Sequence, residues 1–313
     1  MLHDFAVMYG KLFAHSGLSL DRLKTFHDIA TAGGISAAAG DDSNRQSQFS
    51  RQLKELERFF GVELIKRGRG PIRLTDAGQR LFRIIGHSFG ALEEFRQTCA
   101  EQPVELIIGA GESLIQWLLL PRLAGLTVAH PRLAVTFQNL RTEEILKHLL
   151  DGGVDFGVVT HFEPNRQLGS VSLGRLAYCL FVPKALLPAE RTFKIRSELL
   201  SRVPLALLDG SPGIWQALEN EASKKRLKLN VRLRFSSYPQ LAQAVQSMNV
   251  AAIMPKLAGP SLDAAKIQCV SLPFLNALAR QVSLVWNKSM AEVRPAIEIY
   301  SRLLPPIFSF EES

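Results

Sequence analysis

The chain has little cysteine, and its three cysteines, Cys99, Cys179 and Cys269, are far apart in the sequence. None belongs to a C-x-x-C pair and no H-E-x-x-H stretch occurs, so the usual spacings of zinc ligands are missing. We therefore expect no metal site and no cofactor. Cys179 and Cys269 lie in the strand-like stretches AYCLFV and IQCVSL, which favours buried, unreactive thiols over redox sensing.

Long apolar runs are also missing. No segment approaches the roughly 18 apolar residues that a membrane-spanning helix needs. The first 17 residues do not resemble a signal peptide, because His3 and Asp4 interrupt the apolar stretch and no small-residue cleavage site follows. They form a short arm or result from an upstream start codon. We expect a cytoplasmic protein without a membrane partner.

The motifs of common enzyme classes are incomplete. In IIGAGESL, Leu114 occupies the third glycine position of a dinucleotide-binding loop, and the next strand ends without a ribose-binding acid. In DGSPG, Asp209 occupies the first glycine position of a hydrolase motif, and no histidine partner is evident. The sequence predicts a protein that is not an enzyme. The alternative is a cytoplasmic two-lobed α/β enzyme or solute-binding protein with a basic N-terminal domain.

Positive charge is abundant and unevenly placed. The formal net charge is +8, and residues 45–73 hold eight bases and three acids, so this segment alone carries a net charge of five (8 − 3). The bases are Arg45, Arg51, Lys54, Arg58, Lys66, Arg67, Arg69 and Arg73. Such a concentration is typical of a surface that binds a polyanion, whereas a merely solvated charged face is the ordinary alternative.

The same segment contains a strong helical pattern. Phe49, Leu53, Leu56 and Phe60 recur at steps of four, three and four, which places them on one face of a helix. The opposite face is polar and basic, with Ser47, Ser50, Arg51, Lys54 and Arg58. A short alanine-rich helix and the turn DDSN precede this helix, and two apolar runs follow it around the basic loop KRGRGP. This order predicts a winged helix-turn-helix whose longer helix enters the major groove of DNA.

The run from Leu20 to Leu81 resembles the DNA-binding domain of the LysR-type transcriptional regulators. The stretches that carry the resemblance align with the family pattern without gaps; they are LDRLKTFHDIATAGGISAAA, SRQLKELERFFGVELIKR and RLTDAGQRL. The family commonly has Ser-Gln-Pro-Ala-Leu-Ser where this chain has RQSQFS. The resemblance therefore implies DNA binding but leaves the recognised base sequence open.

The resemblance implies double-stranded DNA as a partner, with RNA polymerase as a further candidate. Contacts to bases are expected from Gln46, Ser47, Gln48 and Arg51. Contacts to phosphate or to the minor groove are expected from Ser50, Lys54, Arg58, Arg67, Arg69 and Arg73.

A long helix is predicted after the wing, with Thr75 as its N-cap and Asp76 in its first turn. Apolar positions then alternate steps of four and three and form a heptad seam, which consists of Leu81, Ile85, Ser88, Leu92, Phe95 and Cys99. The linker helices of the resembled family pair two copies, so we expect a homodimer or homotetramer. Packing of the seam against its own domain is the alternative.

From Val104 onward, strands alternate with helices, which predicts an α/β fold with two lobes. This half resembles the LysR effector-binding domain, itself similar to periplasmic solute-binding proteins. The predicted parts are an arm (1–17), a winged helix-turn-helix (18–75), a linker helix (76–102) and an effector domain (103–313). Within the effector domain, we assign residues 103–162 and 269–313 to lobe I and residues 163–268 to lobe II.

Two lobes that the chain crosses twice form a cleft, and small molecules bind in such clefts at strand ends. We predict effector contacts from Gly111, Glu112, Ser113, Thr160, His161, Leu208, Asp209 and Ser211. The family typically offers two hydroxyls in the first loop, whereas only Ser113 remains here. The expectation is a small polar metabolite that favours one of two arrangements of the oligomer, and the alternative is an empty cleft.

Overall fold

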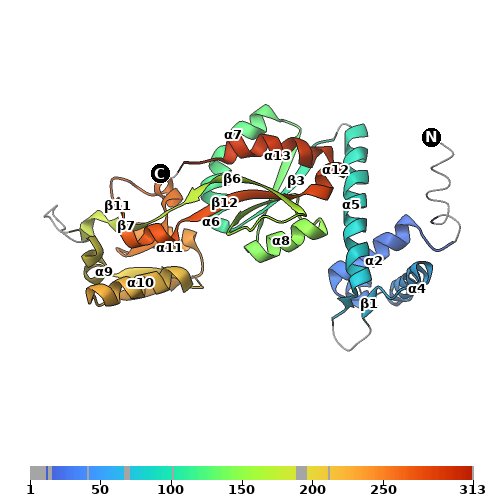
Figure 1. Ribbon diagram of the computed structural model, residues 1–313, viewed down its shortest axis with the longest axis horizontal. Coiled ribbons are helices and arrows are strands. Elements are labelled where there is room, and N and C mark those ends of the chain that lie inside the picture. Colours follow the sequence, from blue (N-terminus) through green and yellow to red (C-terminus); the bar gives the residue numbers. More distant parts are fainter. Residues whose placement is uncertain are drawn as a thin grey trace. The chain divides into compact units, whose positions relative to one another are not determined.

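The computed structural model describes residues 12, 16–40, 42–66, 71–100, 102–187, 196–210 and 212–311 (Figure 1). The chain divides into two compact units. The first comprises Met1–Cys99 with Leu150–Gly153, and the second comprises Ala100–Leu149 with Val154–Ser313. Most of the predicted N-terminal arm lies outside the described residues.

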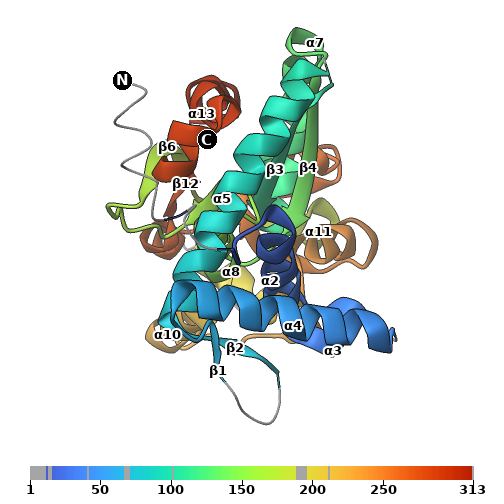
Figure 2. The same ribbon diagram turned by 90° about the vertical axis from the view of Figure 1, so that its right-hand side faces the viewer.

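The first unit confirms the predicted order of helix, turn, longer helix and wing. Its elements are α2 (Leu20–Ala32), α3 (Ile35–Ala39), α4 (Ser43–Phe60), β1 (Ile65–Lys66), β2 (Arg73–Leu74) and α5 (Asp76–Cys99). The wing strands are antiparallel and pair Ile65 with Leu74 and Lys66 with Arg73. Helix α4 crosses the N-terminal end of α5, beside the two wing strands (Figure 2).

Polar caps decide where the helices of this unit begin. The carboxylate of Asp42 accepts hydrogen bonds from the backbone N–H groups of Asn44 at 2.9 Å and Arg45 at 3.1 Å. Helix α4 therefore starts at Ser43, inside the predicted DDSN turn, because this N-cap satisfies two otherwise free donors. Gly61 ends the helix in a left-handed conformation, with φ of 69°.

The apolar face of α4 packs into the core of the unit, with one exception. Phe49, Leu53 and Leu56 are buried together with Phe26 of α2. Phe60 lies at the end of the same helix face but is 36% exposed, and its ring meets the Phe59 ring edge-on at a centroid distance of 5.0 Å. The helix ends at the next residue, Gly61, so Phe60 has no following turn that could carry it into the core.

Leu64 connects α4, the wing and α5. Its backbone N–H donates to Glu57 Oε1 at 2.8 Å, and its carbonyl oxygen accepts from the Thr75 N–H at 3.0 Å. The Thr75 hydroxyl accepts from the Gly78 N–H at 3.0 Å, which confirms Thr75 as the N-cap of α5. A Cβ added to Gly78 would lie 2.0 Å from the Leu64 oxygen, so only glycine fits at this contact.

The second unit begins with a sheet of five strands in the order β4-β3-β5-β12-β6. The strands are β3 (Val104–Ala110), β4 (Leu133–Asn139), β5 (Phe156–Thr160), β6 (Leu168–Leu176) and β12 (Arg280–Asn287). Strands β4, β3 and β5 are parallel, whereas β12 runs antiparallel to both β5 and β6. Helices α7 (Leu120–Ala129) and α13 (Pro295–Phe308) cover one face and α8 (Thr142–Asp151) the other (Figure 1). A three-residue helix, α6 (Glu112–Leu114), and a π-helical turn (Ile115–Leu119) lead into α7, and α12 (Lys288–Val293) joins β12 to α13.

The second sheet also has five strands, in the order β11-β7-β10-β8-β9. The strands are β7 (Tyr178–Pro183), β8 (Leu205–Leu208), β9 (Val231–Phe235), β10 (Ala251–Pro255) and β11 (Ile267–Val270). The helices of this lobe are α9 (Leu199–Arg202), α10 (Pro212–Lys225) and α11 (Tyr238–Ser247). The described residues of this lobe also form 3-10 turns at Lys184–Leu186, Arg196–Glu198, Lys256–Ser261 and Pro273–Leu278. The two mixed sheets confirm the predicted two-lobed α/β fold.

The strand pairing corrects both predicted lobe boundaries. Strand β6 pairs with β12 in the first sheet, so the chain leaves the first lobe at Ala177 rather than near residue 163. Strand β11 pairs with β7 in the second sheet, so the chain returns at Ala279 rather than near residue 269. Both strands pair antiparallel with their neighbours, whereas a succession of βαβ units predicts parallel pairing.

The structure also corrects the expectation for the cysteines. Cys179 of β7 and Cys269 of β11 form a disulfide with a Cα–Cα distance of 6.2 Å. Cys179 is fully buried, whereas Cys269 and the free Cys99 are exposed. The two bonded cysteines have a sequence separation of 90, and the bond ties the edge strand β11 to the neighbouring strand β7.

Replacing Gly78 by alanine is expected to destabilise the first unit. The added Cβ would overlap the Leu64 carbonyl oxygen, and overpacking of this kind costs about 1–3 kcal/mol. Denaturant unfolding followed by circular dichroism measures the effect. The control is Gly125→Ala in α7, where nothing lies within 4 Å of the new Cβ and the helix should gain stability. Equal stability changes in the two variants would contradict the close contact.

Candidate functional site

Helix α4 carries most of the predicted DNA-contacting residues, and five of them are exposed: Ser47, Gln48, Arg51, Lys54 and Arg58. These five point away from the face that buries Phe49, Leu53 and Leu56. The three cations, together with the uncharged polar side chains of Ser47 and Gln48, form one accessible strip along the helix. Such a strip can place donors against phosphate oxygens and against the edges of bases.

Arg51 is held only loosely by the protein. Its side chain is 75% exposed, and its Nε lies 4.0 Å from Oε1 of Glu55. The other oxygen of Glu55 is bound by Arg22 of α2, at 2.6 Å from Nη2 and 2.8 Å from Nε. Because Arg22 engages Glu55 more closely, the Arg51 guanidinium keeps its donors available for another acceptor.

Two of the predicted DNA-contacting residues, Gln46 and Ser50, are only partly exposed. Gln46 is half-buried, and its Nε2 donates to the Gly40 carbonyl at 3.0 Å across the turn between α3 and α4. Ser50 is also half-buried. Arg45 is one of the eight bases of the segment but not one of the expected individual DNA contacts. It is exposed, and its guanidinium stands 5.2 Å above the Phe49 ring at the start of the same strip.

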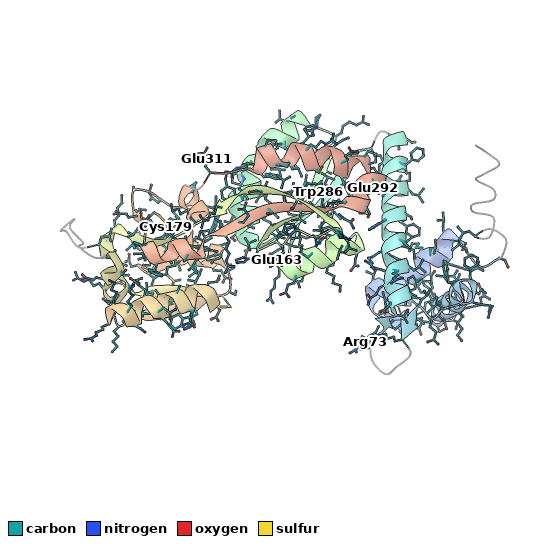
Figure 3. The ribbon with its side chains drawn as sticks, viewed as in Figure 1. Arg73, Glu163, Cys179, Trp286, Glu292 and Glu311 are labelled. Carbon is teal, nitrogen blue, oxygen red and sulfur yellow. A yellow bond between two sulfur atoms is a disulfide. The ribbon has the colours of Figure 1, made fainter. Side chains whose placement is uncertain are left out.

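The wing adds two exposed cations beside this helix. Lys66 and Arg73 face each other across the wing strands, and both are exposed. Figure 3 shows Arg73 at the base of the wing. Arg67 and Arg69, the predicted cations of the wing tip, lie outside the described residues.

In the second unit, the sheet brings one group of predicted effector contacts together. Strands β3 and β5 are parallel neighbours that pair Ala110 with Val158, so their carboxyl ends meet at the same edge. Gly111, Glu112 and Ser113 follow β3, and Thr160 and His161 end and follow β5. His161 has a positive φ of 56°, which costs about 1–3 kcal/mol for such a residue. Strain of this size is found most often at functional sites.

The other predicted contacts belong to the second sheet. Leu208 ends β8, and the exposed Asp209 follows it, with its carboxylate 3.7 Å from Arg234 of β9. Ser211 lies outside the described residues.

Sequence reasoning missed the residues at the lobe crossings. Tyr178 directly follows the first crossing, Arg280 directly follows the second, and Tyr238 begins α11. Tyr178 bonds to Tyr238, and burial raises the pKa of Tyr178 although the Arg280 charge and that hydrogen bond oppose the shift. The hydroxyl therefore stays protonated at neutral pH. Correct lobe boundaries would have identified both crossing residues.

Two polar atoms near these elements are buried and have no hydrogen-bond partner within the described residues. They are Nε1 of Trp117, which is 6% exposed, and Oγ of Ser237, the N-cap residue of α11. Trp117 comes from the first lobe but packs among buried residues of the second, including Phe181 and Leu241. An unsatisfied buried donor is unfavourable, so these atoms mark places where a ligand or water would be stabilised.

Comparison with known families identifies both halves of the chain. Residues 20–79 match "Bacterial regulatory helix-turn-helix protein, lysR family", and residues 100–302 match "LysR substrate binding domain". The chain belongs to the LysR family of transcriptional regulators. It is accordingly a DNA-binding regulator with an effector-binding domain, and it is not the two-lobed enzyme kept as the alternative.

Two relatives that match most of this LysR-family chain are named as transcriptional activators. A "Probable nitrogen assimilation transcriptional activator" of Synechocystis is 24% identical over 91% of the chain and 96% of its own length. The transcriptional activator CmpR of Synechocystis is 25% identical over 72% of the chain and 75% of its own length.

Solved structures share the fold. A full-length OxyR variant from Pseudomonas aeruginosa superposes with a TM-score of 0.64 at 19% identity, covering 94% of this chain and 95% of that one. ArgP from Mycobacterium tuberculosis gives 0.63 at 16% identity, covering 89% and 95%. Among the described residues of this chain, no helix is both long and apolar enough to cross a membrane.

Two arginines of the first unit should affect DNA binding differently. Arg51→Ala is expected to relax the preference at one base position by about 1–3 kcal/mol, because a bidentate contact to a base edge would be lost. Arg73→Ala is expected to weaken binding to all sequences and to reduce the salt slope by about one unit. Gel-shift titrations across a salt series measure both effects. The control is Arg166→Ala, an exposed arginine of the second unit. If all three variants bind like the unaltered protein, the strip on α4 is only solvated surface.

Proposed function

We propose that the chain reads a specific DNA sequence with the exposed strip of α4. Gln48 and Arg51 contact bases together with Gln46 and Ser47. Ser50, Lys54, Arg58, Arg67, Arg69 and Arg73 contact phosphate or the minor groove. The observation that carries this assignment is the weak engagement of Arg51 on an exposed helix face whose other side is buried. From this activity on chromosomal DNA we infer a cytoplasmic location. RNA polymerase is the partner through which the protein would alter transcription.

The second part of the proposal is self-association through α5. The first half of its heptad seam packs inside the unit, where Ile85 is buried and the Phe82 ring stacks on His27 at 4.6 Å. The second half of the seam is exposed instead: Leu92 is 53% exposed and Phe95 is 70% exposed. Exposed apolar side chains at heptad spacing favour a pairing helix. We therefore propose that residues 76–102 act as the linker of a homodimer or homotetramer.

The third part concerns the effector, for which we propose a small polar metabolite bound between the lobes. The proposed contacts are Gly111, Glu112, Ser113, Thr160, His161, Leu208, Asp209 and Ser211. The support is threefold: strand ends that meet at one sheet edge, the strained backbone of His161, and buried donors on Trp117 and Ser237. Binding would alter DNA affinity through different affinities for two arrangements of the oligomer.

Charged residues in the α5 seam should dissociate the oligomer. The double variant Leu92→Asp, Phe95→Asp would bury two carboxylates in an apolar interface, which is strongly unfavourable. Analytical ultracentrifugation is expected to show monomers. The matched control is Val128→Asp, Met248→Asp, which changes two exposed apolar residues of the second unit. Unchanged assembly in the α5 variant, or dissociation in the control, would place the interface elsewhere.

A metabolite screen by thermal shift tests the effector site. A ligand that binds only the folded protein should stabilise it by about 2.7 kcal/mol at 100 times its Kd. Ser113→Ala is expected to reduce this stabilisation while leaving the melting temperature without ligand nearly unchanged. If the ligand stabilises this variant fully, the binding site is elsewhere. If no metabolite stabilises the unaltered protein, the cleft is empty.

A further inference from the structure

A second concentration of positive charge lies in the effector domain, far along the chain from the DNA-binding helix. Residues 224–234 contain six bases and no acid. All six side chains are exposed: Lys224, Lys225, Arg226, Lys228, Arg232 and Arg234. This basic segment comprises the end of α10, the following loop and the edge strand β9.

The basic segment borders a hollow of about 630 Å³ on the surface of the second lobe. One wall is a face of α10, with Trp215, Gln216, Glu219, Asn220, Ala222 and Ser223. The other wall is the returning chain, from Arg226 to Leu229. The volume falls in the range of small-molecule sites, which is about 300–1,000 Å³.

Most of the positive charge at this hollow is not compensated by the protein. Arg234 lies 3.7 Å from Asp209, and Arg232 donates to the Asn230 side chain at 3.0 Å. Lys224, Lys225, Arg226 and Lys228 form no ion pair among the residues that the structure describes. Adjacent uncompensated cations raise the local potential and attract an anion.

The backbone of Arg226 has a strained conformation. Arg226 has a positive φ of 53°, and it follows α10 in a C-terminal cap where its N–H donates to Ser223 O and the Leu227 N–H donates to Ala222 O. Glycine is the preferred residue at such a position, because a side chain there is strained. Arg226 also lines the hollow. A guanidinium thus lies at a strained backbone position beside the hollow, and strain of this kind clusters at functional sites.

We propose that this hollow binds an organic phosphate, such as a nucleotide or a phosphorylated sugar. Arg226 and Lys228 bind the phosphate groups, and Lys224 and Lys225 strengthen the local field. The amides of Gln216 and Asn220 and the carboxylate of Glu219 bind hydroxyl groups of the ligand along α10. A phosphate group avoids Glu219, because like charges repel, so the ligand lies with its phosphates toward the returning chain.

This site is separate from the proposed effector cleft and does not depend on it. No residue lining the hollow belongs to the predicted effector contacts. Arg234, which does not line the hollow, stands 5.2 Å above the Trp215 ring and pairs with Asp209.

Calorimetric titration of the full-length protein at constant ionic strength tests the proposal. The probes are ATP, inorganic tripolyphosphate, adenosine and sulfate. ATP is expected to bind most tightly, tripolyphosphate more weakly, and adenosine and sulfate least, because the site recognises both the phosphates and the hydroxyl-bearing part.

Substitutions at the hollow give the decisive comparison. Arg226→Gly is expected to weaken ATP binding by about tenfold or more while raising the melting temperature, because the charge-assisted bonds are lost and the strain is relieved. Lys228→Gln should weaken binding similarly without a change in folding. Lys147→Gln, an exposed lysine on α8, is the matched control and should bind ATP normally.

Three results would overturn the proposal. The first is no binding of ATP or tripolyphosphate to the unaltered protein. The second is binding that survives in Arg226→Gly and Lys228→Gln but is lost in Arg51→Ala, which would assign the phosphates to the DNA-binding helix. The third is a loss of DNA affinity in Arg226→Gly without any phosphate binding, which would make the basic segment a DNA contact.

Discussion

The backbone of Leu64 sets the geometry of the DNA-binding half. Its N–H is bound by Glu57 at the end of α4, its carbonyl is bound by the Thr75 N–H, and Gly78 of α5 lies directly against that oxygen. The longer helix, the wing and the start of the linker helix therefore form one rigid body. Any arrangement that fixes two copies of α5 also fixes the distance between two copies of α4. This is how a paired regulator could measure the spacing of two half-sites on DNA.

The effector half depends on a different constraint, which is that the chain crosses between two sheets twice. The crossings at Ala177 and Ala279 place Tyr178 and Arg280 at the first position of the strands that follow. A ligand held by strand ends of one lobe and by these residues would contact both lobes at once. Its binding energy could then favour one relative position of the lobes, which is the physical requirement for a conformational response.

Sequence reasoning succeeded where a local pattern has a single structural solution. The burial of Phe49, Leu53 and Leu56 and the cap at Thr75 follow from helix periodicity and N-terminal donors. It failed where distant segments decide the outcome, because strands β6 and β11 and the disulfide of Cys179 depend on pairing across the fold. Strain at His161 and Arg226 is a property of the folded backbone, and no pattern in the sequence reveals it.

On the proposed function, two copies of α4, fixed by α5, read DNA in the major groove. The test is the selection of bound duplexes from a random DNA pool by the full-length protein, followed by sequencing. The expected result is an enriched motif with dyad symmetry, whose half-sites are separated by whole turns of about 10 base pairs. Enrichment of no motif, or of a single half-site without a symmetric partner, would contradict it.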